Sequence, residues 1–197
     1  MFTTLAKPAQ HSEVVKNSEF LGFAVPAPDV PIALEFIAQF RLERPDASHV
    51  AWAYKIGTQY RFSDDGEPSG TAGAPIFRAL ETSGLDCVAI AVVRYYGGVN
   101  LGTGGLARAY GGTAAETLRV AERLEVYPRL PVTITVSFEA MGALYRILEG
   151  FSLTAREDAF TEHGLTVRCQ LLETDYDKLE VQVRDATRGK GVVEGCY

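Results

Sequence analysis

The feature that most constrains the fold is a short, wholly apolar run, Cys87–Val93, which is soon followed by a glycine-rich stretch. At seven residues it is the longest apolar run in the chain, whereas a membrane-spanning helix needs about 20. The run therefore predicts a strand, Asp86–Arg94, that is central in a sheet or covered on both faces. The opening stretch, MFTTLAKPAQ, lacks the apolar core of a signal peptide, so we expect a cytoplasmic protein without a membrane contact.

Periodicity and capping residues predict further elements around this strand. Asp29 and Pro31 mark a helix start, and aromatic residues in alternating positions indicate a hairpin after it. The predicted elements are a helix over Val30–Glu43, strands over His49–Ile56 and Gln59–Phe62, a helix that starts near Thr71, and a long helix from the glycine-rich stretch to Leu124.

A second set of elements follows a linker flanked by Pro128 and Pro131. It comprises strands over Val132–Phe138, Phe151–Phe160 and Leu165–Leu171, helices around Leu144–Leu148 and from a cap at Thr174, and a short strand around Val192. This βαββαβ order is typical of a ferredoxin-like fold. We therefore predict an α+β protein with two domains, residues 1–127 and 128–197.

The net charge limits the classes of partner, and the cysteine content indicates the redox compartment. The chain carries 25 acidic and 19 basic side chains, a formal net charge of -6, so any contact with RNA must be local, and we expect no DNA partner. The three cysteines, Cys87, Cys169 and Cys196, form no C-x-x-C pair and fit a reducing compartment. Cys87 is expected to be a buried structural thiol, and Cys196 to lie in a mobile terminus.

The stretch Arg94–Tyr110 joins the apolar strand to the long helix and contains the first candidate site. Unpaired N–H groups and the positive end of the helix dipole favour a phosphate or carboxylate there. The predicted anion-binding residues of this loop are Arg94, Gly102, Thr103, Gly104, Gly105 and Arg108. A Walker loop is excluded because Thr103 stands where its lysine belongs, and no acidic strand end follows to complete a dinucleotide fingerprint. In the alternative interpretation, the glycines only permit tight turns and close packing.

The turn-rich stretch at residues 62–73 contains the second candidate site. Asp64, Asp65 and Glu67 place three carboxylates within four positions, a pattern that suits Mg²⁺ or acid–base chemistry. Alternatively, they cap backbone turns and the start of the next helix. Ser69 and Thr71 are assigned to the same binding surface as the loop Arg94–Tyr110; Ser69 is not in a nucleophile elbow. His49, in an apolar strand, is predicted to be a structural histidine.

Three stretches together resemble the IMPACT-type family of cytosolic proteins: ASHVAWAY at 47–54, SDDGEPSGTAGAPI at 63–76 and VVRYYGGVNLGTGGLARAY at 92–110. The resemblance implies a ribosomal protein S5 domain 2-like fold for the first domain and a C-terminal domain similar to the last domain of elongation factor G. It also implies a link to translation. Asn100 departs from the lysine of many relatives and Tyr96 from their phenylalanine, which weakens the case for phosphate contact at Asn100.

These observations leave two functional hypotheses. The first is a non-catalytic binding or regulatory protein, whose two loops engage RNA, the ribosome or a translation-associated protein. It is favoured because no complete catalytic set is present. The second is a metal-assisted hydrolase of a phosphorylated or peptide substrate, with Asp64, Asp65 and Glu67 as ligands. The first needs no cofactor, and the second needs Mg²⁺ or a similar ion.

Overall fold

The computed structural model describes residues 1–195 and divides into two compact units. The N-terminal unit comprises Phe2–Val126, and the C-terminal unit comprises the residues from Tyr127 onward together with Met1. The division lies one residue before the boundary predicted from the sequence. Cys196, for which we expected a mobile terminus, lies outside the described residues.

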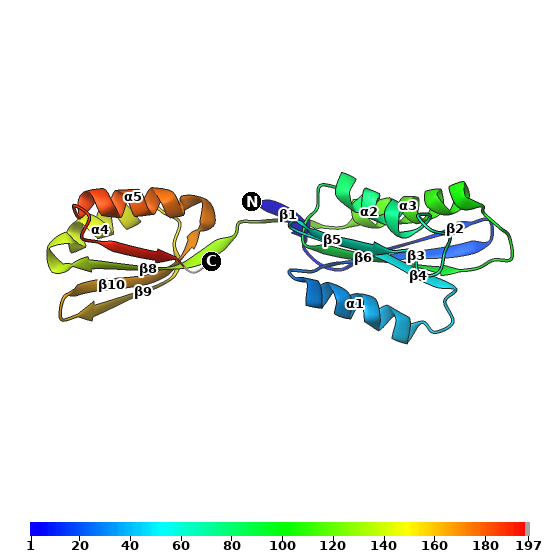
Figure 1. The fold of residues 1–197 in the computed structure, drawn as a ribbon, viewed down its shortest axis with the longest axis horizontal. Coiled ribbons are helices and arrows are strands. Elements are labelled where there is room, and N and C mark those ends of the chain that lie inside the picture. The colour runs from blue at the N-terminus through cyan, green and yellow to red at the C-terminus, as the bar shows by residue number, and fades with distance from the viewer. Residues whose placement is uncertain (196–197) are drawn as a thin grey trace. The chain divides into compact units, whose positions relative to one another are not determined.

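A five-stranded antiparallel sheet forms the N-terminal unit, in the order β2-β3-β6-β4-β5 (Figure 1). Its strands are β2 (Ala9–Val15), β3 (Ser18–Pro26), β4 (His49–Ile56), β5 (Gln59–Ser63) and β6 (Val88–Tyr95). Helix α1 (Val30–Glu43) covers one face, and helices α2 (Gly73–Thr82) and α3 (Thr103–Val120) cover the other (Figure 1). Strands β1 (Phe2–Leu5) and β7 (Arg123–Val126) pair separately.

Val88–Val93 of the apolar run lie in β6, the central strand of this sheet, whereas Cys87 precedes the strand with φ 54° and is only partly buried rather than the buried thiol expected. Ala89, Ala91 and Val93 pack into the core beneath α1. Val88, Ile90 and Val92 pack into the core beneath α2 and α3. Successive side chains of a strand point to opposite faces, so a strand covered on both sides has no polar face and shows no alternation.

Two parts of the N-terminal unit differ from the sequence prediction. Strands β1, β2 and β3 lie in a region for which no element was predicted. The predicted long helix ends at Val120, and Leu124 lies in β7 with 49% of its surface exposed. Leu124 fitted the helical spacing, but the backbone becomes extended at Ala121, and the following residues pair with β1 instead.

The C-terminal unit is a four-stranded antiparallel sheet in the order β11-β8-β10-β9, with both helices on one face (Figure 1). Its elements are β8 (Arg129–Ser137), α4 (Met141–Leu148), β9 (Thr154–Thr161), β10 (Gly164–Leu172), α5 (Tyr176–Ala186) and β11 (Val192–Gly195), with 3₁₀ turns at Phe138–Ala140 and Glu173–Asp175. Alternate residues of β8 and β10 bury an apolar core against the two helices.

Two residues of this unit lie in other elements than predicted. Pro131 does not bound a linker: it lies inside β8 opposite Gln170, because its exposed side chain continues the alternation begun at Leu130. Thr174 does not cap α5: it lies in the preceding 3₁₀ turn, and the cap position is Asp175, whose side chain makes no capping bond. Within residues 1–195, no helix is long and apolar enough to cross a bilayer.

Candidate functional site

The two glycine-rich loops meet at one end of the N-terminal sheet and enclose a cleft of about 470 Å³. They meet because His49, at the start of β4, lies opposite Arg94, near the end of β6. The first loop contributes Glu67 and Pro68, and the second contributes Gly102 and Thr103. The remaining lining residues are His49, Arg94, Tyr96, Asn100, Leu101 and Leu106.

A buried ion pair forms the base of the cleft. Arg94 Nη1 donates to Glu67 Oε1 at 2.6 Å, and the Tyr110 hydroxyl donates to the same oxygen at 2.8 Å. Glu67 and Arg94 are 8% and 5% exposed, and Tyr110 is fully buried. Burial, followed by the hydrogen bond to Glu67, raises the pKa of Tyr110 far above its ordinary value, so this hydroxyl remains a donor.

One nitrogen of the Arg94 guanidinium has no hydrogen-bond partner among the described residues. Nη2 donates to the Ser18 hydroxyl at 3.4 Å, but the buried Nε has no hydrogen-bond acceptor among the described residues. The guanidinium lies 5.6 Å from the centre of the Phe20 ring and 5.4 Å from that of Tyr96. Aromatic faces attract a cation, which offsets part of the cost of burying it.

His49 is held in one orientation at the side of the cleft. Its Nδ1 lies 2.8 Å from the backbone carbonyl oxygen of Asp65. A carbonyl only accepts, so Nδ1 carries the hydrogen, and in the neutral ring Nε2 is an acceptor. Nε2 lies 3.9 Å from Glu67 Oε1. His49 was predicted to be a structural histidine, whereas the structure also places it in the lining of the cleft.

The N-terminus of α3 opens at the cleft without a side-chain cap. Gly102 occupies the cap position with φ 72°, a conformation that favours glycine, and the first turn contains no acidic residue. The amides of Thr103, Gly104 and Gly105 therefore have no partner within the helix, as is general for a first turn. Gly102, Thr103 and Gly104 are exposed. This end of the 18-residue helix presents donors and the positive end of its dipole to a ligand.

The position of the second loop is fixed by the hairpin turn between β2 and β3. The Ser18 hydroxyl accepts a hydrogen bond from the Gly97 amide at 3.2 Å. A Cβ atom at Gly97 would lie 1.9 Å from the Asn17 carbonyl oxygen. Only glycine fits this approach, so the start of the loop is held against the turn.

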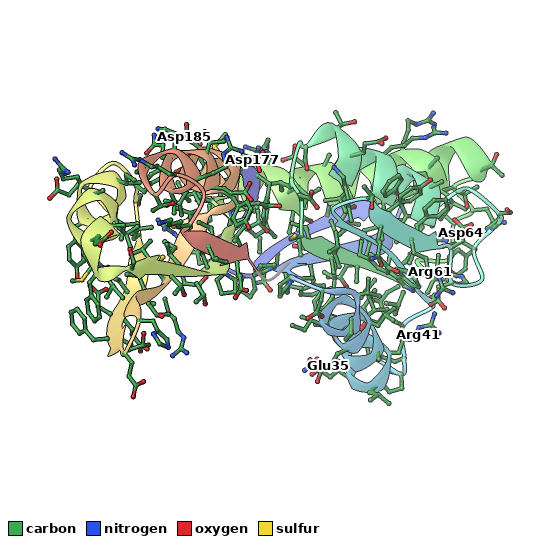
Figure 2. All side chains as sticks on the ribbon, turned by 60° about the vertical axis from the view of Figure 1, so that its left-hand side comes forward. Glu35, Arg41, Arg61, Asp64, Asp177 and Asp185 are labelled. Carbon is green, nitrogen blue, oxygen red and sulfur yellow. The ribbon has the colours of Figure 1, made fainter. Side chains whose placement is uncertain are left out.

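The three carboxylates of the first loop have different partners. Asp64, labelled in Figure 2, accepts hydrogen bonds from the amides of Gly70, Ala72 and Gly73 at 2.8, 2.9 and 2.8 Å. These bonds cap the start of α2. Burial is the largest single influence and would raise the pKa of Asp64, but the three amides together lower it below its ordinary value. This is the capping role that the sequence analysis gave as its alternative.

Asp65 and Glu67 do not converge with Asp64 on a common point. Asp65 accepts from the Val50 amide at 2.6 Å and forms an ion pair with Arg41, while Glu67 is engaged by Arg94. In the described part of the chain, no group of three or more His, Cys, Asp or Glu side chains is arranged to hold a metal ion. The Mg²⁺ site remains a prediction from sequence.

Of the other predicted site residues, four lie in or beside the two loops and one, Arg108, lies away from the cleft. Gly104 and Gly105 lie in the first turn of α3, Ser69 is exposed beside the cleft, and the Thr71 hydroxyl donates to the Pro68 carbonyl inside the first loop. Arg108 does not line the cleft; it lines a groove on the outer side of α3. At about 100° per residue, five positions after Thr103 place Arg108 on a different side of the helix.

Comparison with known proteins gives these loops a family. The model described as "Impact N-terminal domain" matches residues 16–118, a stretch that contains both loops and all residues that line the cleft. The chain belongs to the IMPACT family. The "IMPACT family member in pol 5'region" of Thermus thermophilus is 43% identical over 183 residues, which cover 92% of this chain and 100% of that protein. IMPACT family member YigZ of Escherichia coli is 34% identical over 192 residues, covering 93% and 92%.

A likeness to a solved structure also covers the whole chain. A solved structure described as "Crystal structure of an hypothetical protein" superposes with a TM-score of 0.71 at 30% identity and covers 100% of this chain and 97% of that one. An IMPACT family member of Haemophilus influenzae is 44% identical over 187 residues. The matches thus include the C-terminal unit as well as the Impact N-terminal domain.

Proposed function

We propose that this IMPACT-family protein is a non-catalytic binding protein linked to translation, and that its cleft binds a phosphate group of RNA, free or within the ribosome. One observation carries the proposal: the uncapped N-terminus of α3 opens into the same cleft as the buried Arg94. Backbone amides at a helix start and a nearby guanidinium are suited to an anion. The resemblance of the three sequence stretches supports the link to translation and a cytoplasmic location.

The charge of the cleft favours weak and salt-sensitive binding. Arg94 is already neutralised by Glu67, so the helix amides and the Thr103 hydroxyl provide the additional contacts. The net charge of the chain is -6, which opposes the approach of a polyanion. A carboxylate of a translation-associated protein offers the same chemistry to the cleft, and it is the alternative partner.

The arrangement of the carboxylates favours binding over catalysis. A metal-assisted hydrolase would need Asp64, Asp65 and Glu67 as free ligands around one ion. Each of them instead accepts hydrogen bonds from backbone amides or from other side chains. We therefore propose the binding role.

The finer fold assignments are part of the same proposal. We assign the N-terminal unit to the ribosomal protein S5 domain 2-like fold on the basis of the sequence resemblance. We assign the C-terminal unit to the ferredoxin-like fold; its βαββαβ order and its strand order β11-β8-β10-β9 support this assignment.

Binding of fluorescein-labelled single-stranded RNA, followed by anisotropy at about 50 and 200 mM salt, tests the proposed function. Thr103→Asp places a carboxylate at the start of α3, where the helix dipole tolerates it, and opposes a phosphate. We expect RNA affinity to fall at least about tenfold, equivalent to about 1.4 kcal/mol. Thr174→Asp introduces the same charge at an exposed position of the C-terminal unit and serves as the control. Equal RNA affinity of Thr103→Asp and wild type, or no RNA binding at either salt concentration, contradicts the proposal.

A further inference from the structure

The groove between α2 and α3 is separate from the cleft and has a different chemistry. It encloses about 550 Å³ on the outer side of the two helices. Its floor consists of small or apolar residues: Pro75 and Ala79 from α2, and Ala107, Gly111 and Ala115 from α3. The three α3 residues are spaced by four and therefore lie along one face of the helix.

The groove exists because the two helices approach closely at a glycine. A Cβ atom at Gly111 would lie 3.4 Å from Pro75 Cβ. With small side chains on both sides of this contact, neither helix presents a ridge to fill the space above it. A shallow apolar channel between the helices is the result.

Four arginines line the groove, and no acidic residue does. They are Arg78, Arg108, Arg119 and Arg123. Arg108 and Arg119 are eleven residues apart, about three helical turns, so they lie on the same side of α3 at a separation of about 16 Å. This local concentration of positive charge contrasts with the net charge of -6 of the whole chain.

Three of these arginines, Arg78, Arg108 and Arg123, have no charged partner among residues 1–195. Arg119 pairs with Glu116, and Arg123 donates to the Ser83 carbonyl oxygen at 3.1 Å. Arg78 and Arg108 are exposed and form no ion pair with any residue from 1 to 195. Their charge is therefore available to a partner.

We propose that this groove binds an acidic amphipathic helix of a partner protein. Apolar side chains at helical spacing in the partner would fill the floor over Ala107, Gly111 and Ala115, and flanking carboxylates would meet the arginines. RNA fits the same features less well. Phosphates gain nothing from an apolar floor, and no aromatic side chain lines the groove to stack on a base. This binding surface is distinct from the cleft, so the proposed RNA contact and the helix-binding groove are independent of each other.

Anisotropy with a fluorescein-labelled acidic amphipathic peptide of roughly five helical turns tests the groove. The probe has leucines at i, i+3, i+4 and i+7 and glutamates beside them; a scrambled peptide of the same composition is its control. We expect saturable binding that weakens with salt, and at least tenfold weaker binding of the scrambled peptide. Arg78→Ala with Arg108→Ala should weaken binding at least tenfold, whereas Arg146→Ala with Arg184→Ala, the same charge change in the C-terminal unit, should alter it less than twofold.

Ala115→Trp separates the role of the apolar floor from that of the charges. It fills the groove at an exposed position and retains all four arginines, so it should weaken peptide binding about as much as the double arginine variant. Thr103→Asp should leave peptide binding unchanged, which distinguishes failure of the groove from failure of the cleft. The inference is overturned if the peptide does not bind, if neither groove variant weakens its binding, or if single-stranded RNA displaces it from the wild type but not from the double arginine variant.

Discussion

The interiors of the two units differ in a way that separates a site from a scaffold. In the N-terminal unit, seven polar or charged residues are buried: Thr4, Ser18, Glu67, Thr71, Arg94, Thr113 and Thr117. In the C-terminal unit, none of the residues described from Tyr127 onward is both polar and buried. Buried polar groups are costly unless each finds a partner, whereas an apolar interior needs only shape. The N-terminal unit therefore contains the more specifically arranged interior, in keeping with the binding site proposed there.

The same pairing of arginine with carboxylate occurs in both units and sharpens this contrast. Arg94 and Glu67 are joined beneath the cleft, with side chains 7% and 4% exposed. Arg156 and Asp158 are joined on β9, at 2.7 Å, with side chains 36% and 26% exposed. Solvent screens the second pair and not the first, so the two should differ several-fold in their effect on stability.

The largest expected effect comes from Glu67→Ala, which leaves Arg94 charged, buried and without its carboxylate. We expect the free energy of unfolding of the N-terminal unit to fall by about 3–5 kcal/mol. Urea titration followed by the fluorescence of Trp52, the single tryptophan of the chain, reports this unit specifically. Glu162→Ala, at an exposed turn in the C-terminal unit, should leave this transition unchanged. A loss below about 1 kcal/mol for Glu67→Ala would contradict the expected difference between the buried pair Arg94–Glu67 and the partly exposed pair Arg156–Asp158.

Leu144→Ala tests the apolar core of the C-terminal unit. Leu144 is 1% exposed, and its truncation leaves a cavity that should lower the stability of the C-terminal unit by about 3 kcal/mol. Far-ultraviolet circular dichroism detects the transition of this unit, while the Trp52 transition should keep its midpoint. A shift of both transitions would show that the two interiors are energetically coupled.

Asp64→Asn should have an intermediate effect that depends on pH. At neutral pH, loss of the charged cap of α2 should cost about 2 kcal/mol. The pKa of Asp64 is lowered in the folded protein, so its stabilisation is complete above the unfolded value of about 3.9 and is lost as the pH falls through the folded value. Urea titrations at several pH values should show the difference between wild type and variant shrinking only below about pH 4. A difference that is constant from neutral to strongly acidic pH would contradict a charged cap.

The smallest expected effect is that of Arg156→Ala. Its ion pair with Asp158 is partly exposed, so we expect a loss of about 0.5 kcal/mol, reduced further at high salt. Thermal unfolding followed by circular dichroism at two salt concentrations measures it. A loss as large as that of Glu67→Ala would show that exposure does not separate the two pairs.

Local periodicity predicted much of the architecture. The apolar run predicted β6, the step from glycines to helical spacing predicted the start of α3, and alternation predicted β8 and β10. Leu124 was misplaced because a single apolar residue fits both a helical stripe and a strand, and the choice depends on pairing with β1, more than a hundred positions earlier in the chain. Such pairings between distant segments are not encoded in local spacing.

The site was predicted in outline but not in its contacts. The loops were identified, yet Arg94 was expected to offer its charge to a ligand and instead pairs with Glu67, 27 positions away. His49 joins the cleft because β4 and β6 are neighbours, which no local pattern reveals. Tyr110, whose hydroxyl donates to Glu67, was not predicted to belong to the site, although it lies about two helical turns after Thr103 and so on the same side of α3.

The close approach of Gly97 to Asn17 limits how the backbone of this cleft can change during evolution. The second loop is clamped at its start by a hairpin turn and at its end by the first turn of α3, so its length is fixed between two rigid anchors. An inserted residue would displace the hairpin or the helix. We therefore expect relatives to differ at this cleft in side chains such as Tyr96 and Asn100, while the backbone of the loop stays the same.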